Sequence, residues 1–237
     1  MDYFTFNGTN SLDKGISLID YNHIFIPNNQ RQFIDLPGRD GSIAVGSFSK
    51  KDVVITCEIA ITGENEEEIL NTIEQSKLWL NKSGFLGFWD MPGRKYRGEL
   101  ISSDLVENNK SWDRFNIVFR CNPIKFGEYK EITGTDQTTI TNNGTYKATG
   151  DIEITIEEET EEITVKLEET GERIIINHNF IQGDVVVIDL GEEKATKNGY
   201  NIMEDCYIDS DFFYLPPGNF TIKTGGEYLL KFTERWL

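Results

Sequence analysis

Five apolar side chains, each separated from the next by one residue, run through residues 53–61 and constrain the fold most strongly. Successive side chains of a strand point to opposite faces, so this spacing predicts a half-buried strand. Similar alternation returns at 152–156 and at 163–167. A chain with such rows must bury one face of its sheets, and we therefore expect a mainly-β fold. The first row consists of Val53, Ile55, Cys57, Ile59 and Ile61.

The two halves of the chain predict two different β domains. Residues 1–130 contain hairpin signals and one helical segment, and we expect a β-barrel-like domain there. Residues 131–237 contain short alternating strands with turns every 8–12 residues or so, a pattern typical of an antiparallel β-sandwich. Within this half we expect separate strands at 220–224 and 228–232. The stretch 131–150 is rich in Thr, Gly and Asn and predicts a linker with an entry strand.

One segment, residues 66–82, changes from strand to helix periodicity. Asn65 followed three residues later by Glu68 is typical of an N-terminal cap. Glutamates at the start suit the positive end of the helix dipole, and Ile69, Ile73 and Leu80 mark an apolar stripe. We expect this to be the only substantial helix.

Charge also divides the chain. Residues 1–130 carry 18 acidic and 15 basic side chains, a net −3, whereas residues 131–237 carry 22 and 8, a net −14. The contrast predicts two folding units. The acidic second half should repel nucleic acid and anionic membrane surfaces. We therefore expect no nucleic-acid binding through a basic patch and no membrane binding. There is no run of about 18 apolar residues and no secretion-signal pattern at the N-terminus.

No group of residues predicts catalysis, a metal or a cofactor. The two histidines, His23 and His178, lack partners at ligand spacing. Gly41 and Gly46 have the spacing of a phosphate-binding loop, but Ser47-Phe48 follows where lysine is required. The sequence therefore predicts a protein that is not an enzyme and needs neither metal nor disulfide. Three cysteines without Cys-x-x-Cys spacing are expected to be reduced and mostly buried: Cys57, Cys121 and Cys206.

Three motifs, in this order, resemble a known family. The chain begins with a short extended segment containing Asn-Gly, Phe4–Gly8. The turn Leu36-Pro37-Gly38-Arg39-Asp40-Gly41 follows, and the strand 115–123 closes the first half with Arg-Cys-Asn-Pro. Together they resemble the distal tail proteins of long-tailed phages. The resemblance covers the whole chain and is specific over residues 1–126.

This resemblance implies a structural role in a baseplate hub. It implies a hexameric ring at the virion tail tip, assembled in the cytoplasm of the bacterial host. The ring would connect the tail tube protein to the host-adhesion device, a tail-associated fibre or lysin protein or a receptor-binding protein. It also implies that residues 131–237 form a galectin-like or carbohydrate-module-like sandwich, with residues 1–130 forming the ring.

The turn at residues 36–41 lies inside a predicted hairpin, 32–46. Arg39 and Asp40 at its tip carry opposite charges that could pair between copies in a ring. The alternative is that they are the exposed residues of an ordinary turn. The candidate intersubunit residues are Pro37, Gly38, Arg39, Asp40 and Gly41.

A second function remains open, that of a carbohydrate-binding module which recognises the host surface through the C-terminal sandwich. Sugars stack on exposed aromatic rings, and Phe212 and Tyr214 are the candidates, although such rings also fill sandwich cores. The acidic segment 157–162 could hold Ca²⁺, or it could be a solvated edge that discourages aggregation.

Overall fold

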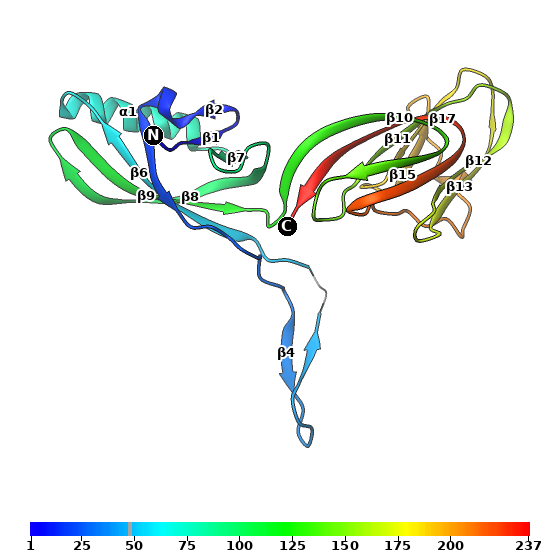
Figure 1. Ribbon diagram of the computed structural model, residues 1–237, viewed down its shortest axis with the longest axis horizontal. Coiled ribbons are helices and arrows are strands. Elements are labelled where there is room, and N and C mark those ends of the chain that lie inside the picture. The colour runs from blue at the N-terminus through cyan, green and yellow to red at the C-terminus, as the bar shows by residue number, and fades with distance from the viewer. Residues whose placement is uncertain (47–48) are drawn as a thin grey trace. The chain divides into compact units, whose positions relative to one another are not determined.

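The structure, a computed structural model, describes residues 1–46 and 49–237. The chain divides into two compact units, Met1–Phe126 together with Leu237, and Gly127–Trp236 (Figure 1). Strands dominate both units, which confirms the predicted mainly-β fold class. No helix among the described residues is long and apolar enough to cross a membrane.

The first unit is built on an antiparallel sheet. Its strands lie in the order β3-β6-β9-β8, and the first residues of β8 also pair with β7, which is followed by β1 and β2. The strand predicted at residues 53–61 is confirmed, because all five alternating side chains are buried in β6. The strands are β1 (Phe4–Phe6), β2 (Thr9–Asn10), β3 (Ile16–Tyr21), β6 (Val53–Thr62), β7 (Gly84–Phe88), β8 (Lys95–Asn109) and β9 (Trp112–Cys121).

The predicted helix is confirmed as α1 (Glu66–Leu80), which ends two residues earlier than expected. The Asn65 side chain accepts a hydrogen bond from the Glu68 backbone N–H at 3.0 Å, as the capping pattern predicted. At the other end of the helix, the Trp79 ring stacks on Phe4 and its Nε1 donates to the Phe6 carbonyl at 3.1 Å. These contacts fix α1 to β1. A short 3-10 helix, η1 (Ser11–Lys14), precedes β3.

The second unit is a β-sandwich, as predicted. β12 and β13 form a hairpin on one layer, while β11, β14, β15 and β16 pair in sequence on the other. Apolar side chains between the layers form one core. The strands are β10 (Lys125–Asn142), β11 (Gly150–Thr155), β12 (Thr160–Leu167), β13 (Arg173–Phe180), β14 (Val185–Asp189), β15 (Lys194–Lys197), β16 (Tyr200–Asn201) and β17 (Gly218–Trp236), with the 3-10 helix η2 (Met203–Asp205) before β17.

β17 belongs to both layers. Its first half pairs with β12 through Ile222 and Lys223, and its second half pairs with β11 over residues 228–232. The prediction of two strands at 220–224 and 228–232 is therefore wrong, because the chain stays extended through Gly225-Gly226 instead of turning.

The stretch 131–150 was predicted to be a linker with an entry strand, and its first part is entirely strand, since β10 continues to Asn142 next to β17. Threonine is a good strand former, and an edge strand needs few apolar side chains. Only Gly134, Ile140 and Asn142 of β10 are buried, so the apolar alternation in this segment is too weak to predict one long strand.

Candidate functional site

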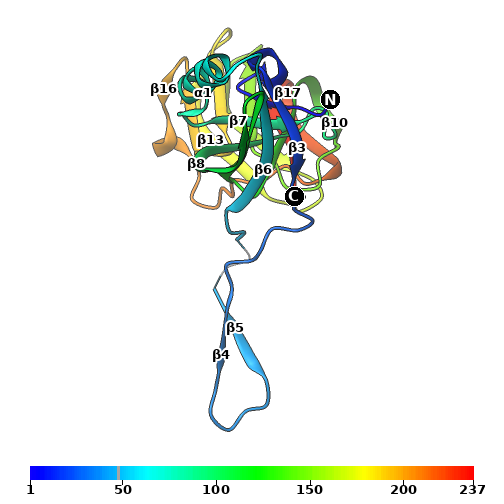
Figure 2. The ribbon, with the colours of Figure 1, turned by 90° about the vertical axis from the view of Figure 1, so that its left-hand side faces the viewer.

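The predicted hairpin at residues 32–46 is present as β4 (Gln32–Asp35) and β5 (Ser42–Val45). Two further backbone hydrogen bonds lie at the base of the hairpin, between its strands and the rest of the first unit. The Gln30 N–H donates to the Ser49 carbonyl at 2.9 Å, and the Lys51 N–H donates to the Asn28 carbonyl at 2.8 Å. We call residues 28–46 and 49–51 the arm. Figures 1 and 2 show it extending away from the rest of the first unit. Ser47 and Phe48, where the phosphate-loop pattern failed, lie outside the described residues.

The tip of the arm contains all five candidate intersubunit residues, and all are exposed. Gly38 and Gly41 both have φ of 79°, a left-handed conformation that favours glycine. The Arg39 N–H donates to the Leu36 carbonyl at 3.2 Å and closes the turn. No hydrogen bond or ion pair joins the Arg39 or Asp40 side chain to any described residue. Both charges are therefore available to a partner.

Most of the apolar side chains of the arm are exposed to solvent. Phe33 is 71% exposed, and Ile34, Leu36 and Val45 are exposed as well. No residue of the arm belongs to either hydrophobic core. Because adjacent side chains of a strand point to opposite faces, Phe33 and Ile34 present apolar surface on both sides. An isolated two-stranded hairpin is at best marginally stable in water, so this surface favours contact with another molecule.

The candidate sugar-stacking residues lie two apart on the segment before β17. Phe212 is half-buried and packs against the sandwich core. Tyr214 is 45% exposed, but the Lys147 Nζ lies 3.5 Å from the centre of its ring. An ammonium group therefore covers the ring face that a sugar would need, unless Lys147 moves.

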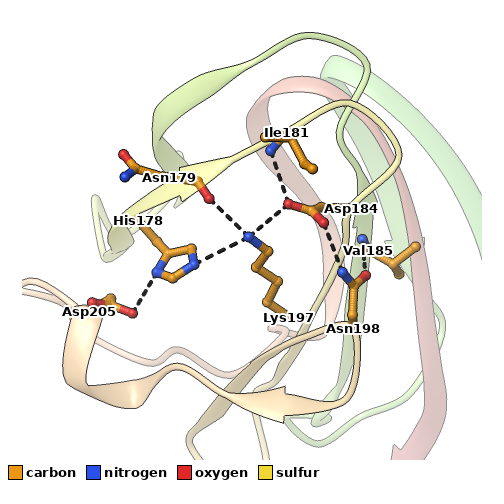
Figure 3. A network of polar contacts seen from close by, with 8 residues as sticks. All are labelled: His178, Asn179, Ile181, Asp184, Val185, Lys197, Asn198 and Asp205. Carbon is orange, nitrogen blue, oxygen red and sulfur yellow. Dashed lines mark hydrogen bonds and ion pairs between the residues drawn. The ribbon is translucent and has the colours of Figure 1, made fainter.

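Sequence analysis missed a polar cluster in the second unit (Figure 3). The Lys197 Nζ contacts Asp184 Oδ2 at 2.9 Å, the Asn179 carbonyl at 2.9 Å and His178 Nε2 at 3.3 Å. Since an ammonium only donates, His178 Nε2 accepts, and its Nδ1–H donates to Asp205 Oδ2 at 2.9 Å. The Ile181 N–H and then the Lys197 ammonium lower the pKa of Asp184 to about 2.

This cluster joins the end of β13, the turn before β14, β15 and η2. All three ammonium protons of Lys197 have acceptors, so the arrangement holds these segments together and presents no open position to a ligand. Across the described residues, no three His, Cys, Asp or Glu side chains are grouped to hold a metal ion. The described cysteines are free, with Cys57 and Cys121 buried and Cys206 half-buried.

This chain is similar in sequence to a protein of a phage tail. A family model described as the siphovirus-type tail component, C-terminal domain, matches residues 143–236. The distal tail protein of Bacillus phage SPP1 is 27% identical over 157 residues, which cover 63% of this chain and 62% of that protein. The match thus spans slightly less than two thirds of the relative's length.

A solved structure extends the likeness in fold to the whole chain. The crystal structure of the SPP1 Dit protein, described as a paradigm of the hub adsorption apparatus in phages that infect Gram-positive bacteria, has a TM-score of 0.87. The match covers 100% of both chains at 19% identity. A chain of the phage P2 baseplate matches at a TM-score of only 0.47 and 10% identity, covering 98% of this chain and 97% of its own length. The resemblance predicted from the motifs of the first half is thus confirmed: the chain is similar to the distal tail proteins, and its residues 143–236 match the C-terminal domain of the siphovirus-type tail component.

Proposed function

We propose that this protein is a structural hub of a phage tail, in which copies assemble into a closed ring through residues 1–130. The observation that carries the proposal is the arm, an exposed apolar projection on a chain whose whole fold matches a distal tail protein. By the family resemblance the ring has six copies and lies at the virion tail tip. It connects the tail tube protein to a fibre, lysin or receptor-binding protein, and its role is structural, not catalytic.

Oligomeric state tests this proposal. We expect mass photometry of the full chain to show a closed oligomer of six copies, stabilised by added tube protein. Residues 131–237 carry −14 per copy, and salt screens their repulsion beyond about 10 Å at 0.1 M. Assembly should therefore strengthen as ionic strength rises. A strict monomer at every salt concentration, with tube protein present, would falsify the hub and favour the carbohydrate-binding module.

We also propose that residues 1–130 and 131–237 fold separately, with the boundary near Phe126–Gly127, where the compact units divide. Each unit has its own hydrophobic core. Residues 127–237 alone should therefore unfold cooperatively, at a denaturant midpoint close to that of the same residues in the full chain. Hydrogen exchange measured on both chains checks this. Loss of protection across β11–β17 in the shorter chain would show that the sandwich depends on the first unit.

A further inference from the structure

We propose that Asn22 and Asp90 are positioning residues, which fix the direction in which the arm leaves the first unit. The inference rests on the proposed ring, because copies can close into a ring only if their projections leave in the same direction. It adds the contacts that set this direction within a single chain. These contacts surround residues 21–23, which we call the root of the arm.

Asn22 follows the end of β3, and Figure 2 shows that β3 and β6 both lead to the arm. The last paired residue of β3 is Tyr21, opposite Cys57. The Asn22 N–H then donates to the Thr56 carbonyl at 3.2 Å. Its side chain continues the pairing, since Oδ1 accepts from the Thr56 N–H at 2.6 Å and Nδ2 donates to the Val54 carbonyl at 3.0 Å. The side-chain amide thus takes the place of a further strand residue, and the main chain is free to leave β6.

Asp90, in the turn after β7, holds the residues on either side of Asn22. The Tyr21 hydroxyl donates to this carboxylate, with its oxygen 2.7 Å from Oδ1 and 2.8 Å from Oδ2. His23 Nε2 lies 3.9 Å from Oδ2. Burial of the ring and the bond to Asp90 both raise the pKa of Tyr21, so the hydroxyl keeps its proton. The Tyr21 ring also stacks on Phe88, with ring centres 3.8 Å apart. The root is therefore attached to β7 as well as to β6.

A short connection, residues 24–27, carries this direction from the root to the arm. These residues make no backbone hydrogen bond to another described residue, so other contacts limit their freedom. Ile24 packs against the core of the first unit. Pro27 is buried, and its ring fixes its own φ and restricts the conformation of Ile26 before it. The connection thus has few alternative conformations, and the arm follows the direction of the root.

The returning side of the arm adds less to this constraint. There the Arg120 guanidinium donates to Asp52 Oδ2, with two N–O distances of 2.8 Å. The two side chains are 61% and 47% exposed, and exposed ion pairs stabilise a structure little. The side-chain contacts of Asn22 and Asp90 on the outgoing side therefore provide the main constraint on direction.

Distances between two spin labels test the direction of the arm. Labels at Gln32→Cys, at the start of β4, and at Leu78→Cys, an exposed position of α1, are introduced in a Cys206→Ser chain. Cys57 and Cys121 are buried and stay unlabelled. An excess of unlabelled chain of the same sequence is added, so that pulsed electron resonance measures distances within one chain. We expect one narrow distance distribution, because the root and the connection allow one direction.

Asn22→Leu and Asp90→Leu remove these hydrogen bonds and keep a similar side-chain volume. Each should raise the fraction of arms in other directions about fivefold or more, the equivalent of one lost hydrogen bond. Tyr21→Phe removes the bonds to Asp90 from the other side, keeps the stacked ring, and should have the same effect. Asp90→Asn keeps an oxygen that can accept from Tyr21 and should restore the parental distribution. Asn71→Leu is the matched control, because Asn71 is exposed on α1, and it should change nothing.

Ring assembly supplies a second readout. In the same variants, the protein concentration at half assembly should rise about fivefold or more, whereas Asn71→Leu should assemble as the parent does. A broad parental distribution, or one that Asn22→Leu and Asp90→Leu leave unchanged, overturns the positioning role and leaves the hub standing. A ring that forms as readily with broadened arm directions does the same. A protein that is monomeric in every condition overturns the hub, and with it the purpose assigned to these residues.

Discussion

Replacing Lys130 with methionine should lower the free energy of unfolding of the second unit by about 3 kcal/mol. Lys130 contacts Glu234 Oε1 at 2.8 Å, and the Glu234 side chain is only 5% exposed. The same oxygen accepts from the Asn143 side chain at 2.8 Å and from its backbone N–H at 3.1 Å. Methionine keeps the bulk of lysine but leaves a buried carboxylate without its cation. Urea unfolding, followed by hydrogen exchange of β17, measures the loss.

A second substitution separates charge from packing. Adding Glu234→Gln to Lys130→Met removes the unpaired charge and keeps an oxygen that can accept from Asn143, so roughly half of the loss should be recovered. If the double variant is as unstable as the sum of the two single variants, the two side chains are not coupled and this explanation is wrong.

The same pair predicts a pH dependence. Burial raises the pKa of Glu234, but the bonds from Lys130 and Asn143 outweigh burial, and the pKa lies below its usual value. A carboxyl whose pKa is lowered by folding stabilises the protein above its unfolded pKa, and this contribution is lost as the pH falls through the folded pKa. The gap in stability between the parent and Lys130→Met should therefore shrink below about pH 4.

Gly98→Ala should destabilise the first unit by about 3 kcal/mol, because overpacking at a rigid site is costly. Gly98 lies between β7 and β9 and pairs with both Gly84 and Cys121. A Cβ there would lie 2.5 Å from the Arg120 carbonyl oxygen and 2.5 Å from Cys121 Sγ. Backbone cannot move aside as a flexible side chain can, so the strands must separate. We expect the melting midpoint of this unit to fall by roughly 10 °C.

Gly225→Ala is the matched control. A Cβ at Gly225 meets nothing within 4 Å, and its backbone does not require glycine. This change should alter stability by less than about 0.5 kcal/mol. Equal effects of the two substitutions would mean that lost glycine flexibility, not the clash at Gly98, determines the result.

The sequence alone predicted the helices and strands that a pattern of neighbouring residues specifies. The alternation in β6 and the cap at Asn65 each specify one element without help from the rest of the chain. The prediction of two strands at 220–224 and 228–232 was wrong at Gly225-Gly226. Paired glycines usually mark a turn, whereas here the partners of β17 on either side keep the strand extended. The full length of β10 was not predicted because its partner β17 lies about 90 residues away in the sequence, and that pairing compensates for the weak alternation in β10.

The candidate sites also differ in whether a local sequence pattern specifies them or only the folded structure brings them together. The turn chemistry of residues 36–41 predicted the hairpin, but apolar residues such as Phe33 and Ile34 would ordinarily indicate burial. Nothing local shows that they project from the unit. The cluster around Lys197 was beyond prediction, because residues of four separate segments meet only once the sandwich has formed.

One consequence concerns how the sandwich opens. A domain whose layers have separate strands can lose one layer while the other persists. Here β17 is shared, so releasing it from β12 also loosens the end of the strand that pairs with β11. Partial opening would therefore cost nearly as much as complete unfolding. We therefore expect the sandwich to unfold as a single cooperative foldon, so that intermediates with exposed strand edges, the species that aggregate, stay rare.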